Sequence, residues 1–93
     1  MKSVNLLPVG SVVTIKDANK KMMIIGILQM SMDKKYDYIA VMFPEGYIDQ
    51  NKVYLFNHSD IEGVEFLGFM DSEFQVFRNN LGMVVDQIEK KDI

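Results

Sequence analysis

Five short runs rich in β-branched and aromatic residues follow one another along the chain, and a polar or glycine-bearing connector separates each from the next. β-branched side chains lose rotamer freedom in a helix and pack well on a pleated sheet, so each run favours a strand. Closely spaced strands with turn residues between them are typical of a small antiparallel sheet. The runs cover residues 11–16, 21–30, 36–43, 52–56 and 64–68.

The second run, residues 21–30, is the most apolar part of the chain (KMMIIGILQM). It shows no clean alternation, which favours a central strand covered on both faces. Gly26 inside it predicts a β-bulge or a sharp bend. A short buried helix is the alternative, because periodicity does not separate the two for a run of this length. Residues 31–35 are expected to form a polar loop.

After Asp71 the pattern changes to a helical one. Six apolar residues recur at spacings of three and four and would form one stripe on a helix over residues 72–90. Ser72 and Gln75 have capping-box spacing, whereas Gly82 predicts a kink or an early end near residues 79–80. The stripe consists of Phe74, Phe77, Leu81, Val84, Val85 and Ile88.

The order of these elements predicts an α+β fold in a single domain, with a β-rich part over residues 7–69 and a C-terminal helix over residues 72–90. Five short strands, with one helical turn before the last, favour a small SH3-like antiparallel barrel. A twisted antiparallel sheet with the helix packed on one face is the alternative. Neither architecture implies an activity.

Charge is distributed unevenly along the 93 residues. Residues 36–73 hold one lysine against eight acidic side chains, a net charge of −7, while the whole chain carries −3. A phosphate backbone requires clustered Lys and Arg, so nucleic acid is not an expected partner. The chain has no cysteine and no apolar run of about 20 residues, so we expect a cytoplasmic protein without disulfides, thiolate zinc or membrane spans.

The only histidine lies in a short polar segment, residues 57–61. His58, Asp60 and Glu62 alternate there, but metal ligands usually come from separate elements, and Asn and Asp in such a segment commonly bond to the local backbone. We therefore interpret Asn57, His58 and Asp60 as a structural turn. No serine, threonine or glycine-rich motif indicates a nucleophile or a phosphate site, so we expect no enzyme, no cofactor and no metal.

The connector after residue 43 is the main candidate for a binding surface. Proline and a glycine two residues later suit a tight reversal, which would leave Tyr47 exposed. Exposed tyrosine is enriched in protein interfaces. The residues predicted for a protein interface are Pro44, Glu45, Gly46, Tyr47 and Asp49.

Several segments together resemble the small bacterial family called domain of unknown function 4176. They follow one another over residues 7 to about 70, whereas the C-terminal helix is only loosely similar. The segments are Leu7-Pro8-Val9-Gly10-Ser11-Val12-Val13, residues 21–26 (KMMIIG), Tyr36-Asp37-Tyr38, Pro44-Glu45-Gly46-Tyr47 and residues 56–61 (FNHSDI).

This resemblance implies a function that the residues alone do not. Members of the family are encoded in Gram-positive bacteria beside type VII secretion genes, near toxins with an LXG domain. The resemblance implies a cytoplasmic targeting factor or chaperone that binds the helical LXG domain of its cognate toxin before export, together with a small helical WXG100-like protein. A self-associating module, for example a homodimer with no role in secretion, is the alternative.

Overall fold

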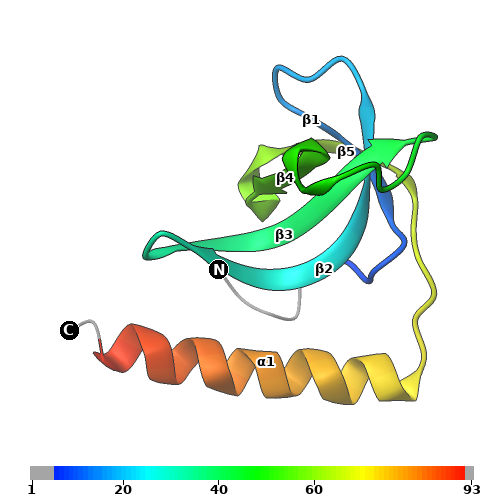
Figure 1. Ribbon diagram of the computed structural model, residues 1–93. Helices are drawn as coiled ribbons and strands as arrows, with labels where there is room; N and C mark the ends of the chain where they lie inside the picture. The colour runs from blue at the N-terminus through cyan, green and yellow to red at the C-terminus, as the bar shows by residue number, and fades with distance from the viewer. Residues whose placement is uncertain (1–5, 92–93) are drawn as a thin grey trace. The chain divides into compact units, whose positions relative to one another are not determined.

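The computed structural model describes the backbone of residues 6–91 and the side chains of residues 6–83. The chain forms two compact units. The first, Leu7–Phe69, holds a β-sheet, and the second holds the helix α1 (Ser72–Lys91) with Leu6, Met70 and Asp71. The class predicted from the sequence, α+β with a C-terminal helix, is confirmed (Figure 1).

The β-unit is one antiparallel five-stranded sheet with the strand order β4-β3-β2-β1-β5. It is not closed, so the open twisted sheet is the observed alternative and the closed barrel is not formed. Two single-turn 3₁₀-helices, η2 (Gln50–Lys52) and η3 (His58–Asp60), lie on either side of β4. The strands are β1 (Val12–Ile15), β2 (Lys21–Ser31), β3 (Lys34–Phe43), β4 (Val53–Phe56) and β5 (Ile61–Phe66).

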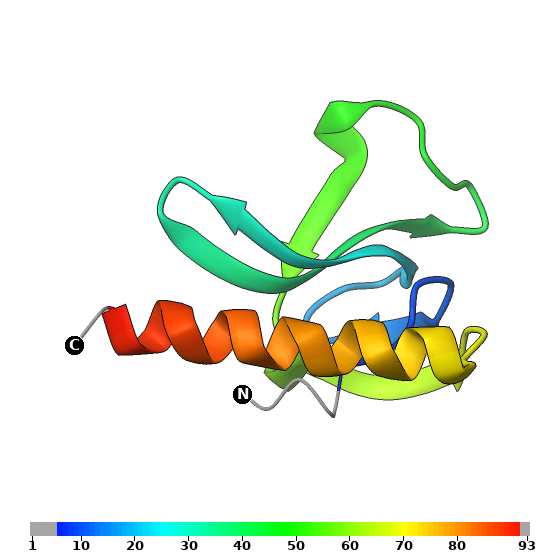
Figure 2. The same ribbon diagram turned by 90° about the horizontal axis from the view of Figure 1, so that it is seen from below.

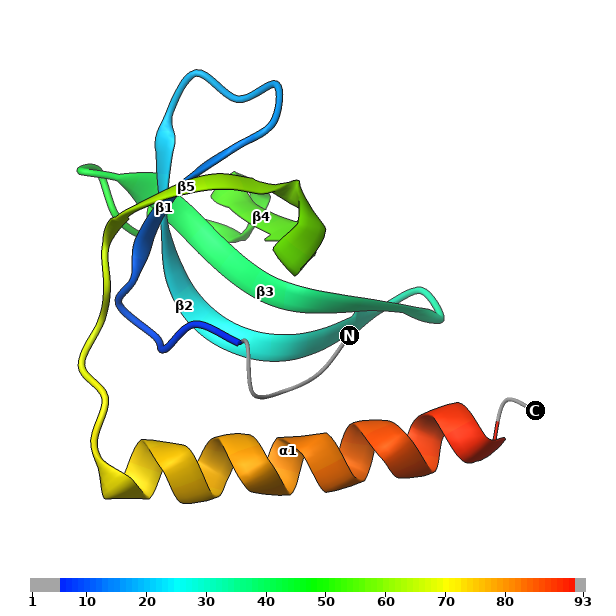
Figure 3. The same cartoon turned by 180° about the vertical axis from the view of Figure 1, so that it is seen from behind.

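The two longest strands, β2 and β3, form a curved hairpin (Figure 3). Its turn consists of Met32 and Asp33 alone, both with positive φ (49° and 69°), and Ser31 pairs with Lys34. Two residues with positive φ match the right-handed twist of the flanking strands. The polar loop expected over residues 31–35 is therefore wrong, because both strands continue to the turn.

β2 lies between β1 and β3, as the apolar run predicted, and is bulged at its glycine. The expected cover on both faces is wrong, because Met22 and Ile24 are buried whereas Ile25 is exposed. Ile24 pairs with Ala40 and Gly26 with Ile39, which leaves Ile25 as the extra residue. A Cβ on Gly26 would lie 2.7 Å from Ile39 Cγ2, closer than real Cβ contacts allow. The bulge predicted at this glycine is confirmed, and the missing side chain is what lets β3 approach.

The core of the sheet is built around Tyr38, the largest fully buried side chain. Its ring lies 5.6 Å from that of Phe56, centroid to centroid, in the tilted arrangement that aromatic pairs favour. Val13 from β1 and Ile24 from β2 are also fully buried. The three central strands therefore all contribute to the core.

The last strand begins earlier than the sequence pattern predicts. β5 starts at Ile61, which pairs with Ile15, and ends at Phe66 instead of covering residues 64–68. The amide of Lys16, the residue after β1, donates to the carbonyl of Asp60, the last residue of η3, 2.9 Å away. Pairing with β1 therefore decides where β5 begins.

The helix α1 runs unbroken through residues 79–80 and Gly82, so neither the kink nor the early end is found (Figure 2). Asp71 caps its first turn: the Asp71 carboxylate accepts a bond from the Phe74 amide at 2.9 Å. The capping box expected from Ser72 and Gln75 is wrong, because Ser72 is already the first helical residue.

The apolar stripe predicted on the helix is described only in part. Phe74 and Leu81 are half-buried and Phe77 is exposed, while Val84, Val85 and Ile88 lie outside the described side chains. Arg78 lies over the Phe74 ring, 5.0 Å from its centroid, and donates to the carbonyl of Leu6 at 3.0 Å. These contacts join Leu6 to the first turns of the helix.

Candidate functional site

Residues 57–60, called the polar turn here, bond to themselves and to β3. The Asn57 amide donates to Asp60 Oδ2 at 2.9 Å, and the Asp60 amide returns a bond to the Asn57 carbonyl at 2.9 Å. Asp37 on β3 makes a second reciprocal pair with the turn. Its amide donates to Asn57 Oδ1 at 3.1 Å, and its carboxylate accepts from the His58 amide at 2.9 Å. All of these contacts hold backbone in place.

The imidazole of His58 bonds to the core of the sheet. His58 Nδ1 lies 2.7 Å from the Tyr38 hydroxyl, and the Leu7 amide donates to the same hydroxyl at 2.9 Å. One hydroxyl thus joins the entering chain, β3 and η3. Tyr38 is fully buried, so this hydroxyl is not accessible to a substrate as a nucleophile.

The described side chains, residues 6–83, contain no cluster of three His, Cys, Asp or Glu residues that could hold a metal ion. His58, Asp60 and Glu62 alternate in the sequence, but the first two are engaged in the polar turn. Asp60 bonds to the Asn57 amide, and His58 to Tyr38. His58 and Asp60 therefore act as hydrogen-bonding residues that hold the turn.

The predicted interface loop, residues 44–49, has fewer ties to the sheet. The Gly46 amide donates to the Met42 carbonyl at 2.8 Å, which closes the reversal after the cis Phe43–Pro44 peptide. The Glu45 carboxylate pairs with the Lys20 ammonium at 2.9 Å, and this hydrogen bond lowers the pKa of Glu45 below its ordinary value of 4.5. Tyr47 is 65% exposed, as the loop pattern predicted.

Asp49, the last residue predicted for the interface, holds local backbone. Its carboxylate accepts a bond from the Asn51 amide at 2.8 Å and caps η2. Of the five predicted interface residues, Glu45 and Asp49 thus use their carboxylates within the chain. Their contact with a partner stays a prediction.

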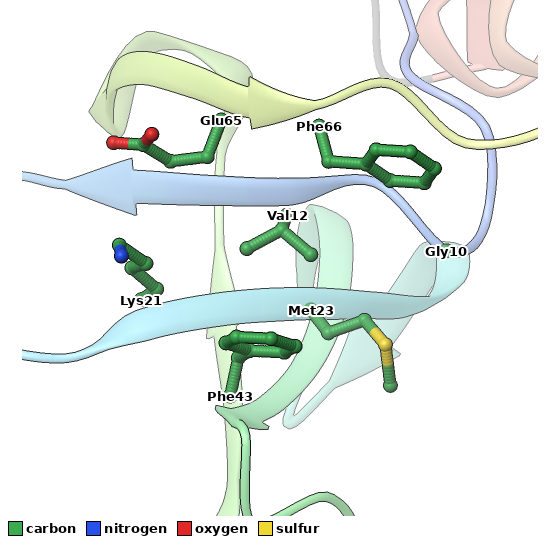
Figure 4. Close-up of a pocket in the computed structure, with 7 residues that line it drawn as sticks. All are labelled: Gly10, Val12, Lys21, Met23, Phe43, Glu65 and Phe66. Carbon is green, nitrogen blue, oxygen red and sulfur yellow. The ribbon is translucent and has the colours of Figure 1, made fainter.

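A third feature, which no pattern in the sequence indicated, is an apolar pocket of about 440 Å³ within the β-unit (Figure 4). Its lining comes from β1, β2, β5 and the end of β3, which the order of the strands brings together. Phe66 is 61% exposed at its rim. We call this cavity the anchor pocket. The side chains that line it are those of Val12, Lys21, Met23, Phe43, Glu65 and Phe66.

A model of one protein family, described as a domain of unknown function (DUF4176), matches residues 6–77. The chain belongs to the DUF4176 family. The match covers the whole β-unit and the first turns of α1, and with them the polar turn, the interface loop and the anchor pocket. No curated protein and no solved structure shows significant similarity to this DUF4176 chain.

Among the described residues, α1 is the only α-helix, and it is too polar to cross a membrane.

Proposed function

We propose that this DUF4176 protein is a non-enzymatic accessory factor of type VII secretion. It binds the helical LXG domain of a cognate toxin in the cytoplasm before export, together with a small helical WXG100-like protein. The observation that carries the proposal is the family match over residues 6–77, which includes every segment on which the resemblance rests.

The chemistry of the described residues supports binding over catalysis. The imidazole of His58 is bonded to a buried hydroxyl, which suits a structural role. Tyr47 is largely exposed on a loop whose backbone is closed by a bond to β3. A tyrosine ring supplies a large contact area at low entropic cost, since it has only two side-chain torsions.

Binding of the partner can be tested directly. The full chain would be titrated with the purified LXG domain encoded beside it, and the heat of binding measured. Tyr47→Ala should weaken binding by about 1 kcal/mol or more, the loss typical of an interface tyrosine. Met32→Ala is a matched control, because Met32 is also exposed at a turn and lies outside the interface loop. If the wild-type chain binds no LXG domain, the proposal fails.

Self-association is the second candidate, and one observation favours it. The exposed side chains of Val64 and Phe66 on β5 offer apolar area to a second copy, with no need for the two strands to pair. Sedimentation equilibrium of the purified chain separates the two candidates. A stable dimer that does not bind the LXG domain would favour the self-associating module.

A further inference from the structure

The edge strand β5 contains two bulges within six residues, and a glutamate is the extra residue of each. Glu62 and Glu65 both lack a partner position on β1. Bulges interrupt the regular row of backbone groups that another strand would need, and charge on an edge opposes such pairing. The paired positions are Val12 with Phe66, Val13 with Val64, Thr14 with Gly63, and Ile15 with Ile61.

The bulge at Glu65 changes what faces the anchor pocket. In a regular strand successive side chains point to opposite faces, so Glu65 and Phe66 would be separated by the sheet. Here both line the same pocket, as Figure 4 shows. The bulge therefore places a carboxylate and an exposed aromatic ring in the lining of one pocket, and bulges commonly redirect side chains in this way next to binding sites.

The pocket combines an apolar part with two opposite charges. Val12 and Met23 lie between the rings of Phe43 and Phe66, while Lys21 and Glu65 lie together toward the other end (Figure 4). No ion pair joins Lys21 and Glu65 within the described side chains. Both charges are thus available to a partner that fills the apolar part.

The edge next to the pocket is unsuited to a second copy of this strand. In a centred antiparallel pairing of two β5 strands, Glu62 of one would face Glu65 of the other, and like charges directly opposite are destabilising. A partner is therefore expected to dock onto the face of the sheet at the pocket. A helix suits this, because it needs no free backbone groups from β5.

We propose that the anchor pocket binds an amphipathic helix of the partner protein. The helix inserts one large apolar side chain between Phe43 and Phe66, and presents an acidic side chain to Lys21 and a basic one to Glu65. Residues three or four apart share a helix face, so an apolar residue with an acidic and a basic residue three and four positions away, both on the same side of it, fits this pattern. This inference rests on the proposed function only for the identity of the partner.

A photoreactive residue at position 66 can identify the protein segment that contacts the anchor pocket. Phe66 would be replaced by the photoreactive p-benzoyl-phenylalanine in the full chain, expressed in its native host, and the cross-linked peptide sequenced. We expect a helical segment of another protein in which an acidic and a basic residue both lie one turn to the same side of an apolar residue. Phe69 is the control position, because it is 80% exposed and does not line the pocket.

Charge reversal tests the two polar contacts with the purified partner. Lys21→Glu and Glu65→Lys should each weaken binding about ten-fold, and the double variant should bind more weakly than either, since both contacts are then repulsive. Glu62→Lys, on the same strand and outside the pocket, should change affinity less than three-fold. If Lys21 and Glu65 only neutralise each other, the double variant recovers wild-type binding and the proposal is overturned.

The outcomes separate this inference from the proposed function. If the helix captured at position 66 belongs to a protein without an LXG domain, and charge reversal weakens its binding, the pocket stands and the secretion role fails. If an LXG domain binds wild type, Phe66→Ala and Lys21→Glu equally well, the secretion role stands and the pocket fails. A cross-link to a second copy or to the chain's own α1, or no cross-link, also overturns it. Circular dichroism of each variant excludes misfolding.

Discussion

The interface loop and the polar turn are both short, polar connectors, yet they are held very differently. The polar turn exchanges two reciprocal pairs of hydrogen bonds, one internal and one with Asp37, and a further bond joins His58 to Tyr38. The interface loop is tied to the β-unit by one backbone bond from Gly46 and by one ion pair of Glu45. Its largest side chain, Tyr47, is exposed.

This difference separates a connector that stabilises the sheet, the polar turn, from one whose largest side chain is free to contact a partner, the interface loop. Asn57 and Asp60 satisfy half-buried backbone groups, and an unsatisfied buried polar group costs about 1–3 kcal/mol. A substitution in the polar turn should therefore act on folding. A substitution in the interface loop should leave folding nearly unchanged and act on binding.

Removal of the Tyr38 hydroxyl is the strongest test of this comparison. Tyr38→Phe deprives the Leu7 amide and His58 Nδ1 of their shared partner, and should lower the free energy of unfolding by about 1–3 kcal/mol. Urea denaturation at neutral pH measures the loss. Tyr47→Phe is the matched control and should unfold as wild type does. Equal stability of the two variants would contradict the role given to the polar turn.

Two aspartates that cap single helical turns give a matched pair. Asp60→Ala removes a half-buried bond to the Asn57 amide and should cost about 1 kcal/mol of stability. Asp49→Ala removes an exposed bond to the Asn51 amide and should cost about half as much. Thermal unfolding of both variants under identical conditions compares them. A larger loss for Asp49→Ala would reverse the ranking of the two connectors.

The exposed tyrosine of the interface loop should have almost no effect on folding. Tyr47→Ala removes a ring that is 65% exposed, so the free energy of unfolding should stay within about 0.5 kcal/mol of wild type. Chemical denaturation of the variant used in the binding titration provides this value. A loss above 1 kcal/mol would show that Tyr47 supports the fold, and would remove it from the interface.

The ion pair of the interface loop gives the smallest expected effect, which depends on pH. The hydrogen bond from Lys20 lowers the pKa of Glu45, so the pair contributes stability above the ordinary pKa of 4.5 and loses it as pH falls through the lowered value. Lys20→Gln should raise the Glu45 midpoint toward 4.5. An NMR titration of the Glu45 carboxyl carbon measures it. An unchanged midpoint would mean that the pair does not persist in solution.

The sequence specified the local features of this DUF4176 chain well. The β-branched runs predicted the strands, Gly26 predicted the bulge, and the apolar spacing after Asp71 predicted α1. The turn at Met32 and Asp33 was missed, because this pair of residue types does not by itself indicate two successive positive φ values. The helix cap was assigned one residue late, to Ser72 instead of Asp71.

What the sequence determined by itself was therefore whatever depends on neighbours along the chain: propensity, periodicity and the exposure of a turn. Only the tertiary structure decided that Asp37 would hold the polar turn, and that Glu65 and Phe66 would face one pocket with Lys21. These contacts depend on strand order and register, which join residues far apart in the sequence. A single bulge in β5 changes which side chains share a face, and no local pattern encodes it.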